Sequence, residues 1–188
     1  SSRTVAQGSG TTYTPSVTAL NGFSSAVSFS LTGLPSGATG TFNPASVTGS
    51  GSSTLTVATA ANTPTGTYTL TITGTSGSLT QTAPVTLIVS SAPSFSLAAS
   101  PGTQTVVQGA ATSFTPAVTG SNGFSAAVTF SVSGLPTGVT GNFNPTSVTG
   151  SGSSTLTLST SAAAVTGSYA LTITGTSGSL TQTGSVTL

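Results

Sequence analysis

The sequence almost completely lacks charge. Its 188 residues include one charged side chain, Arg3, and no Lys, Asp, Glu or His, whereas about a quarter of the residues of a typical globular protein are charged. Acid–base catalysis, activation of a serine nucleophile and metal binding depend on such side chains or on Cys, which is also absent. Nucleic-acid binding needs many cationic side chains. The composition therefore predicts a protein that is not an enzyme, uses no cofactor or metal, and binds no nucleic acid.

Long hydrophobic runs and helical periodicity are missing as well. There is no stretch of about 18 consecutive apolar residues, so we predict no membrane span. Ser and Thr instead make up 77 of the 188 residues. A surface this rich in hydroxyl groups suits covalent O-linked glycans, but Ser and Thr are also ordinary residues for the solvent face of a β-strand. Both interpretations stay open.

Short runs in which apolar and hydroxyl residues alternate are the main structural signal. Such runs occur at 67–73 and 27–32, with equivalents at 168–174 and 128–133. Alternation of this kind places apolar side chains on one face of a strand and polar ones on the other. Gly, Pro and Asn-Gly turn signals separate the runs. Roughly seven short strands per hundred residues, bounded by turns, predict an all-β protein built of antiparallel β-sandwiches.

The chain is an internal repeat. Residues 1–87 align with residues 102–188 at a constant offset of 101 without a gap, and 58 of the 87 aligned pairs are identical. The stretch LTITGTSGSLTQT occurs in full in both halves. Two units of this size can each bury a modest core. We therefore predict two tandem sandwich modules, at 1–89 and 94–188, joined by a linker at 90–93.

One tyrosine in each half stands at an informative position. Tyr68 and Tyr169 each follow a Gly near the start of a late strand. The position suits a tyrosine corner, in which the ring packs inward and the hydroxyl bonds to the backbone. It suits an ordinary half-buried strand tyrosine equally well.

Two motifs in each half carry a family resemblance. GLPxGxxxxFNP occurs at 33–44 and 134–145, and GxYxLTITGTSGSLT occurs at 66–80 and 167–181. With these motifs the chain resembles the immunoglobulin-like tandem repeats of bacterial extracellular proteins, which lie in series on surface proteins or behind secreted hydrolase domains. The resemblance implies two tandem immunoglobulin-like antiparallel β-sandwiches, an extracellular or cell-surface location, and a spacer, adhesive or structural role. It supplies no catalytic residue, and the lack of acidic and Lys residues departs from the family pattern.

One segment, IVSSAPSFSLAASP at 88–101, has no counterpart in the other half. In the family pattern Ile88 and Val89 finish the last strand of module one, and Phe95 and Leu97 point inward from the first strand of module two. Module one then lacks a first strand, and module two lacks the end of its last strand. An open edge of this kind exposes backbone groups and a strip of core. We predict that these four residues dock modules or subunits together.

Three interpretations of the open edge compete. The sequence is a window of a longer array, or a strand of one chain completes the sandwich of the next by strand addition, or module one tolerates a short edge. The first two give a long thread of modules, and a head-to-tail contact that does not close makes a filament. Net charge near zero favours such association. We predict a non-catalytic extracellular structural protein, the repeating subunit of a fibril, filament or surface stalk, with itself as partner.

The alternative is an adhesive, carbohydrate-binding or spacer module of a larger secreted or cell-surface protein. Phe23 and Phe124 each follow Asn-Gly in a predicted turn, where an exposed ring would be free to stack on a sugar. A ring that folds back over the end of its sandwich is the competing interpretation, since large apolar groups are usually buried.

Overall fold

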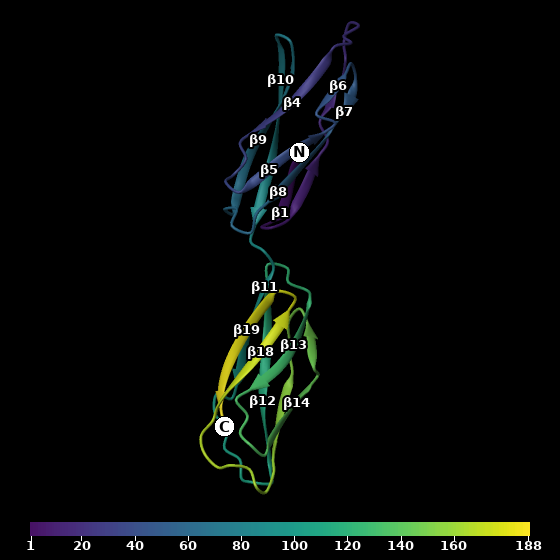
Figure 1. Ribbon diagram of the computed structural model, residues 1–188. Coiled ribbons are helices and arrows are strands. Elements are labelled where there is room, and N and C mark those ends of the chain that lie inside the picture. The colour runs from purple at the N-terminus through teal and green to yellow at the C-terminus, as the bar shows by residue number, and fades with distance from the viewer. The chain divides into compact units, whose positions relative to one another are not determined.

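The computed structural model describes all 188 residues, which form strands joined by turns and loops. The chain divides into two compact units, unit 1 at Ser1–Ala92 and unit 2 at Pro93–Leu188 (Figure 1). No helix long and apolar enough to span a membrane is present. The predicted all-β class is confirmed.

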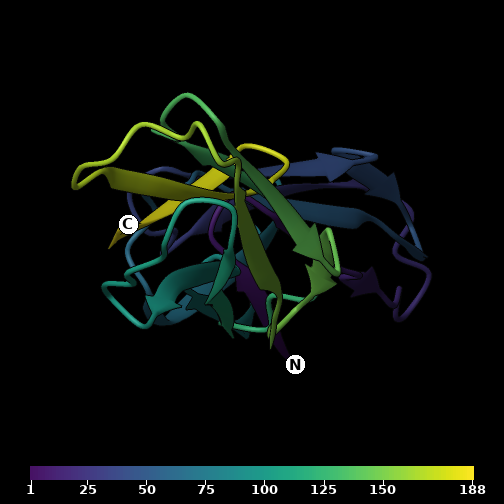
Figure 2. The same ribbon diagram turned by 90° about the horizontal axis from the view of Figure 1, so that it is seen from below.

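Unit 2 shows the fuller set of strands. They are β11 (Ser94–Ser100), β12 (Ala111–Ser121), β13 (Ala127–Ser133), β14 (Val139–Asn144), β15 (Ser147–Thr149), β16 (Gly152–Ser153), β17 (Thr155–Thr160), β18 (Ala170–Ser177) and β19 (Leu180–Thr187). One sheet has the order β11-β12-β17-β14 and the other the order β15-β13-β18-β19. Seen end on in Figure 2, the teal β11 and β12 and the yellow β19 lie in different layers of this unit.

The order of the longer strands in unit 2 defines its class. The first, second, fifth and fourth of them share one sheet, and the third, sixth and seventh share the other. Strands A, B, E and D and strands C, F and G of a constant-type immunoglobulin domain are arranged in the same way. Unit 2 is therefore an immunoglobulin-like β-sandwich.

Unit 1 repeats most of this arrangement but differs in the strands at its edges. Its strands are β1 (Ser2–Ala6), β2 (Gly10–Tyr13), β3 (Ser16–Val17), β4 (Ala26–Thr32), β5 (Ala38–Asn43), β6 (Ser46–Thr48), β7 (Gly51–Ser52), β8 (Thr54–Thr59), β9 (Gly66–Ser76) and β10 (Leu79–Ser90). The sheets are β1-β10-β9-β4-β6, β2-β8-β5 and β3-β7. No strand of unit 1 takes the place that β11 has in unit 2. The counterpart of the long β12 is broken into β2 and β3, and residues 18–20 belong to no strand.

Each core is built by burial of every second residue. Along β8, exposed residues alternate with buried ones, and Leu55 and Val57 have no exposed surface. Unit 1 adds Leu70 and Leu87 to this core, and the fully buried residues of unit 2 include Phe114, Leu156, Leu158, Leu171 and Ile173. Burying one such side chain contributes about 1.5–3 kcal/mol. The alternation that predicted the strands is thus the pattern that closes each sandwich.

The two late-strand tyrosines form tyrosine corners. The Tyr68 hydroxyl donates a hydrogen bond to the carbonyl oxygen of Pro64 at 2.9 Å, and the Tyr169 hydroxyl donates one to the carbonyl oxygen of Thr166 at 3.4 Å. Both rings are half-buried and pack against the core of their unit. A bond from the hydroxyl back to the backbone a few residues upstream is the defining contact of this corner.

The joint between the units is shorter than the sequence suggested. β10 continues through Ser90, which pairs with Ala6 of β1, and β11 begins at Ser94. Residues 91–93 therefore separate the two strands, where the sequence predicted a linker at 90–93. The difference arises because Ser90 gains a parallel partner from a strand more than eighty residues earlier, and local alternation carries no record of that pairing.

Tyr13 provides a test of this packing through pH. It is 3% exposed, and its hydroxyl donates a hydrogen bond to the carbonyl oxygen of Thr86 at 2.7 Å. Burial raises the pKa of Tyr13 above its ordinary value of 10.0, and the Arg3 guanidinium opposes this rise more weakly. The folded state thus keeps the Tyr13 proton where the unfolded chain has begun to lose it.

We expect unit 1 to have its full stability below pH 10 and to lose stability as the pH rises through the folded-state pKa of Tyr13. Tyr13→Phe, which copies Phe114 of unit 2, should lower the stability by about 1 kcal/mol near neutral pH and flatten the alkaline decline. Urea unfolding followed from pH 8 to 11.5 measures both effects. An equal loss of stability at alkaline pH in the unsubstituted chain and in Tyr13→Phe would contradict the prediction.

Candidate functional site

A groove lies along the open edge of unit 1. Its volume is about 590 Å³, and its walls come from residues 15–20 and Phe23, from Val27 and Phe29 of β4, and from β9 and β10 between residues 72 and 83. β3 therefore forms one wall, and the two long strands of the other sheet form the opposite wall. The groove opens between the two sheets of one sandwich, where part of the core meets solvent.

In unit 2 the corresponding place is occupied by β11. This strand pairs antiparallel with β12, with Phe95 opposite Gly120 and Leu97 opposite Val118. Its side chains also reach the other sheet, because a Cβ built on Gly175 of β18 would lie 3.4 Å from the Phe95 ring and 3.5 Å from Leu97 Cδ2. β11 thus closes the gap between the sheets as well as adding a strand to one of them.

The walls of the two sites have nearly the same sequence but differ in burial. Leu79 of unit 1 is 60% exposed, whereas its counterpart Leu180 packs against a cluster of Phe95, Val118 and other apolar residues. Val17 is half-buried, whereas its counterpart Val118 is 3% exposed. Unit 1 has no cluster equivalent to this one. The same wall is therefore covered in one unit and open in the other.

The four residues predicted to dock modules lie inside their own units. Phe95 is buried and Leu97 is half-buried in unit 2, Val89 is 2% exposed in the core of unit 1, and Ile88 is half-buried beside it. The structure brings Phe95 and Leu97 together on one strand, and Ile88 and Val89 on another. They complete their own sandwiches, and a contact of theirs with a neighbouring subunit stays a prediction.

The two loop phenylalanines occupy equivalent positions with different neighbours. The ring of Phe124 lies 5.1 Å from the ring of Phe95 at an interplanar angle of 39°, so it is folded back onto β11. Phe23 is half-buried and lines the open groove of unit 1. A sugar-stacking role for either ring stays a prediction. The Phe124 ring already packs against the Phe95 ring.

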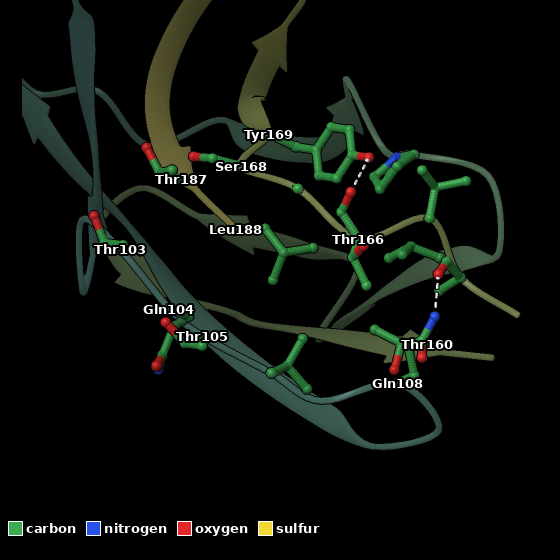
Figure 3. Close-up of a pocket in the computed structure, with 16 residues that line it drawn as sticks. Thr103, Gln104, Thr105, Gln108, Thr160, Thr166, Ser168, Tyr169, Thr187 and Leu188 are labelled. Carbon is green, nitrogen blue, oxygen red and sulfur yellow. Dashed lines mark hydrogen bonds between the residues drawn. The ribbon is translucent and has the colours of Figure 1, made fainter. Parts of the chain in front are cut away.

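Unit 2 has its own opening at its other edge. A pocket of about 280 Å³ lies between residues 103–108, Tyr169 and the end of β19, and Figure 3 shows Leu188, Thr166 and Tyr169 around it. Thr103 makes a single parallel bridge to Thr187 here. Tyr169 and Gln108 make the hydrogen bonds drawn in the figure, and the Gln108 amide donates to the carbonyl oxygen of Ala164 at 2.7 Å.

The same place in unit 1 is closed by the end of β10. β1 pairs in parallel with β10 over five residue pairs, from Ser2 with Thr86 to Ala6 with Ser90. Val5 is 5% exposed there, whereas its counterpart Val106 is half-buried. One segment, 88–101, therefore closes one edge of each unit, since its first residues complete unit 1 and its strand β11 completes unit 2.

The chemistry of both openings is restricted to apolar packing and neutral hydrogen bonds. No charged or titratable side chain lines the groove of unit 1, whose polar lining comes from Ser, Thr and Gln. Such a surface offers exposed apolar side chains and the free side of an edge strand. An extended peptide with apolar residues at alternate positions satisfies both features, because it can bond to the backbone and bury side chains at once.

Several residues of the groove were not singled out from the sequence. Leu20 and Leu79 are 72% and 60% exposed, and Gly74 leaves room beside Val27 and Phe29. Leu79 and Gly74 lie in the repeated stretch LTITGTSGSLTQT, and only the comparison with the covered unit reveals their role. Leu20 did carry a signal, because the other half has Ser at the aligned position.

Comparisons with known proteins leave the family unassigned. No family model matches the chain, and no curated protein matches it. Solved structures similar to it include domains 4 and 5 of the S-layer protein SbsC, with 18% identity, a TM-score of 0.41, and coverage of 85% of this chain and 68% of that one. The titin I-band fragment I67-I69 has 14% identity and a TM-score of 0.41, covering 100% and 62%. The endo-fucoidan hydrolase MfFcnA4 has 14% identity and a TM-score of 0.35, covering 98% and 27%.

The sequence identities and TM-scores are too low to support a functional comparison. The chain also spans less than two thirds of the titin fragment and of the hydrolase. The class of the protein rests instead on the strand order and the tyrosine corners. The chain is a tandem pair of immunoglobulin-like β-sandwiches.

Proposed function

We propose that this chain is a non-catalytic structural protein, a repeating part of an extracellular filament, fibril or surface stalk in which sandwich modules are joined end to end. The observation that carries the proposal is the double role of residues 88–101, which complete one sandwich and begin the next. A segment that closes an edge in both neighbours leaves only residues 91–93 between the two strands it forms. Repeating the same joint extends the array without any new kind of contact.

The composition supports an extended array outside the cell. The chain has one charged side chain, so little electrostatic repulsion keeps modules apart. Trypsin-like proteases have a single cleavage residue to recognise, Arg3. The many Ser and Thr residues on the outer strand faces offer attachment points for O-linked glycans, which would solvate an uncharged polymer. Strand complementation between neighbouring modules is the joint that we propose for the array.

The adhesive alternative places sugar binding at Phe23 and Phe124. A glycan-array screen of the full chain tests it, with Phe23→Ala and Phe124→Ala as matched variants. Binding that both substitutions abolish would favour an adhesive module. The structural role predicts no glycan binding that depends on either ring. The Phe124 ring packs against Phe95, and Phe23 lines the groove.

Electron microscopy of the native material tests the structural proposal. Antibodies against residues 1–188, used for gold labelling of the cells that make the protein, should mark the cell surface. Material sheared from those cells should appear as threads that carry the label. Label confined to the cell interior, or release of separate particles alone, would contradict the proposal.

A further inference from the structure

We propose that the groove of unit 1 is a binding site for an extended β-strand with the sequence pattern of β11, supplied by an adjoining repeat of the same sequence type. This rests on the array proposed above, and it adds the bound segment, its register and the residues that hold it. The 101-residue offset carries the argument, because it matches the wall of the open groove to the wall that contacts β11 in unit 2.

The register follows from unit 2. There β11 runs antiparallel to β12, with every second residue facing inward. The same pairing, moved by the offset, sets the Phe, Leu and second Ala of a bound SFSLAAS strand opposite Ala19, Val17 and Pro15. The intervening Ser and Ala residues face solvent, as in β11, where Ser96 and Ala98 are exposed. Residues 18–20 then gain a strand partner. Their counterparts, residues 119–121, have such a partner in β11 and belong to β12.

The inner face of the groove matches the side chains of such a strand. In unit 2 the Phe95 ring is held between the Phe124 ring and Gly175, and the counterparts of these two residues are Phe23 and Gly74. Gly74 has no side chain to obstruct the ring. Leu79 forms the apolar rim at this end, and Leu20, which replaces a Ser of unit 2, extends that rim. The groove and the strand are both uncharged, so binding leaves no buried charge unpaired.

The source of the strand is an adjoining repeat rather than β11 of a second copy of these 188 residues. Phe95 is 3% exposed and Leu97 packs against two apolar clusters of unit 2. Moving β11 into another chain would open in unit 2 the groove that it closes in unit 1. Such an exchange gains no additional burial, whereas a further segment of the same type adds a new strand.

A synthetic peptide with the sequence of residues 91–101, SAPSFSLAASP, is the probe, labelled at its N-terminus and titrated with the full chain. Fluorescence anisotropy measures binding, and methyl NMR signals of Val17 and Leu79 report its place. We expect saturable binding that shifts both signals. A control peptide with Ser in place of Phe and Leu should bind more weakly by roughly 100-fold, since each large apolar side chain contributes a factor of about ten or more.

Two substitutions in the groove should remove binding. Gly74→Leu fills the groove, and its Cβ would lie 3.1 Å from Val27 Cγ1, so that side chain must shift by a few tenths of an ångström. Leu79→Ser removes the rim and changes a side chain that is 60% exposed, which keeps the test valid if Gly74→Leu fails to fold. Ser30→Leu is the matched control, because exposed Ser30 follows Phe29 on β4 and faces the opposite side of the sheet.

Each outcome decides for or against the proposal. Binding that Gly74→Leu and Leu79→Ser abolish, and that Ser30→Leu leaves unchanged, supports it. No binding, or binding that both groove variants retain, overturns it. Sedimentation of the free chain as a dimer that the peptide dissociates would assign the groove to β11 of a second copy, and so overturn the adjoining repeat as its source. Threads seen by microscopy without peptide binding would reject this site and leave the structural function standing.

Discussion

Replacing Phe95 by Ala should lower the free energy of unfolding of unit 2 by about 3–5 kcal/mol, the usual cost of removing a buried aromatic side chain. The Phe95 ring is 3% exposed and packs against the ring of Phe124 at 5.1 Å. Removal of the ring leaves a cavity between the sheets and weakens the packing of β11 against β12 and β18. For a domain of about 100 residues the loss corresponds to a decrease in Tm of more than about 10 °C.

The expected change is local to unit 2. Because the two units are separate compact bodies, hydrogen exchange measured by mass spectrometry on the full chain should show faster exchange in residues 94–188 and unchanged exchange in residues 1–92. Ser96→Ala, on the exposed face of the same strand, should change neither. Equal effects in both units, or an effect of Ser96→Ala as large as that of Phe95→Ala, would show that β11 does not act through this packing.

Phe95→Ala also shows what determines the burial of the Leu that the two units share. Because β11 covers the wall of unit 2, its loosening should expose Leu180 as Leu79 is exposed in unit 1. Both are the Leu of the identical stretch GTSGSLTQT, yet one is 60% exposed and the other packs in a cluster. Burial at this position is therefore set by the strand that lies over it and not by the local sequence.

Period-two alternation was enough to predict most of the fold. It located strands that form both cores, such as β4 and β9, because the side chains on one face of each strand must be apolar for the sheets to pack. The offset repeat then fixed the number of units. The inward positions of Phe95 and Leu97, which the resemblance to immunoglobulin-like repeats implied, are seen within unit 2, where Phe95 is buried and Leu97 packs against apolar clusters.

Pairings between distant segments could not be predicted in this way. β1 pairs in parallel with β10, and neither strand carries a local signal for the other. Residues 14–18 and 115–119 read TPSVT and TPAVT, yet the second stretch lies in one long strand and the first is interrupted after Tyr13 and again after Val17. The difference is the presence of β11 beside one of them, because a strand persists where a partner takes up its backbone groups. The groove of unit 1 exists because this unit has no strand equivalent to β11.

The glycine that opens the GLPxG motif is expected to be a highly sensitive backbone position of unit 2. Gly134 has φ of +87°, and a Cβ on it would lie 2.6 Å from the carbonyl oxygen of Ala170. Gly134→Ala should therefore cost about 1–2 kcal/mol for the left-handed backbone and roughly a further 1–3 kcal/mol for the overpacked contact. The motif is thus explained by a turn that presses its backbone against the start of β18.

Gly123→Ala separates the two contributions. Gly123 has φ of +76°, close to that of Gly134, but a Cβ there would meet nothing within 4 Å. It should cost only the backbone part, about 1–2 kcal/mol, so the difference between the two variants isolates the contact with Ala170. Urea unfolding of each variant, monitored by hydrogen exchange in residues 94–188, provides the comparison. Equal losses would show that the close approach to Ala170 relaxes without cost and that φ alone requires glycine in the motif.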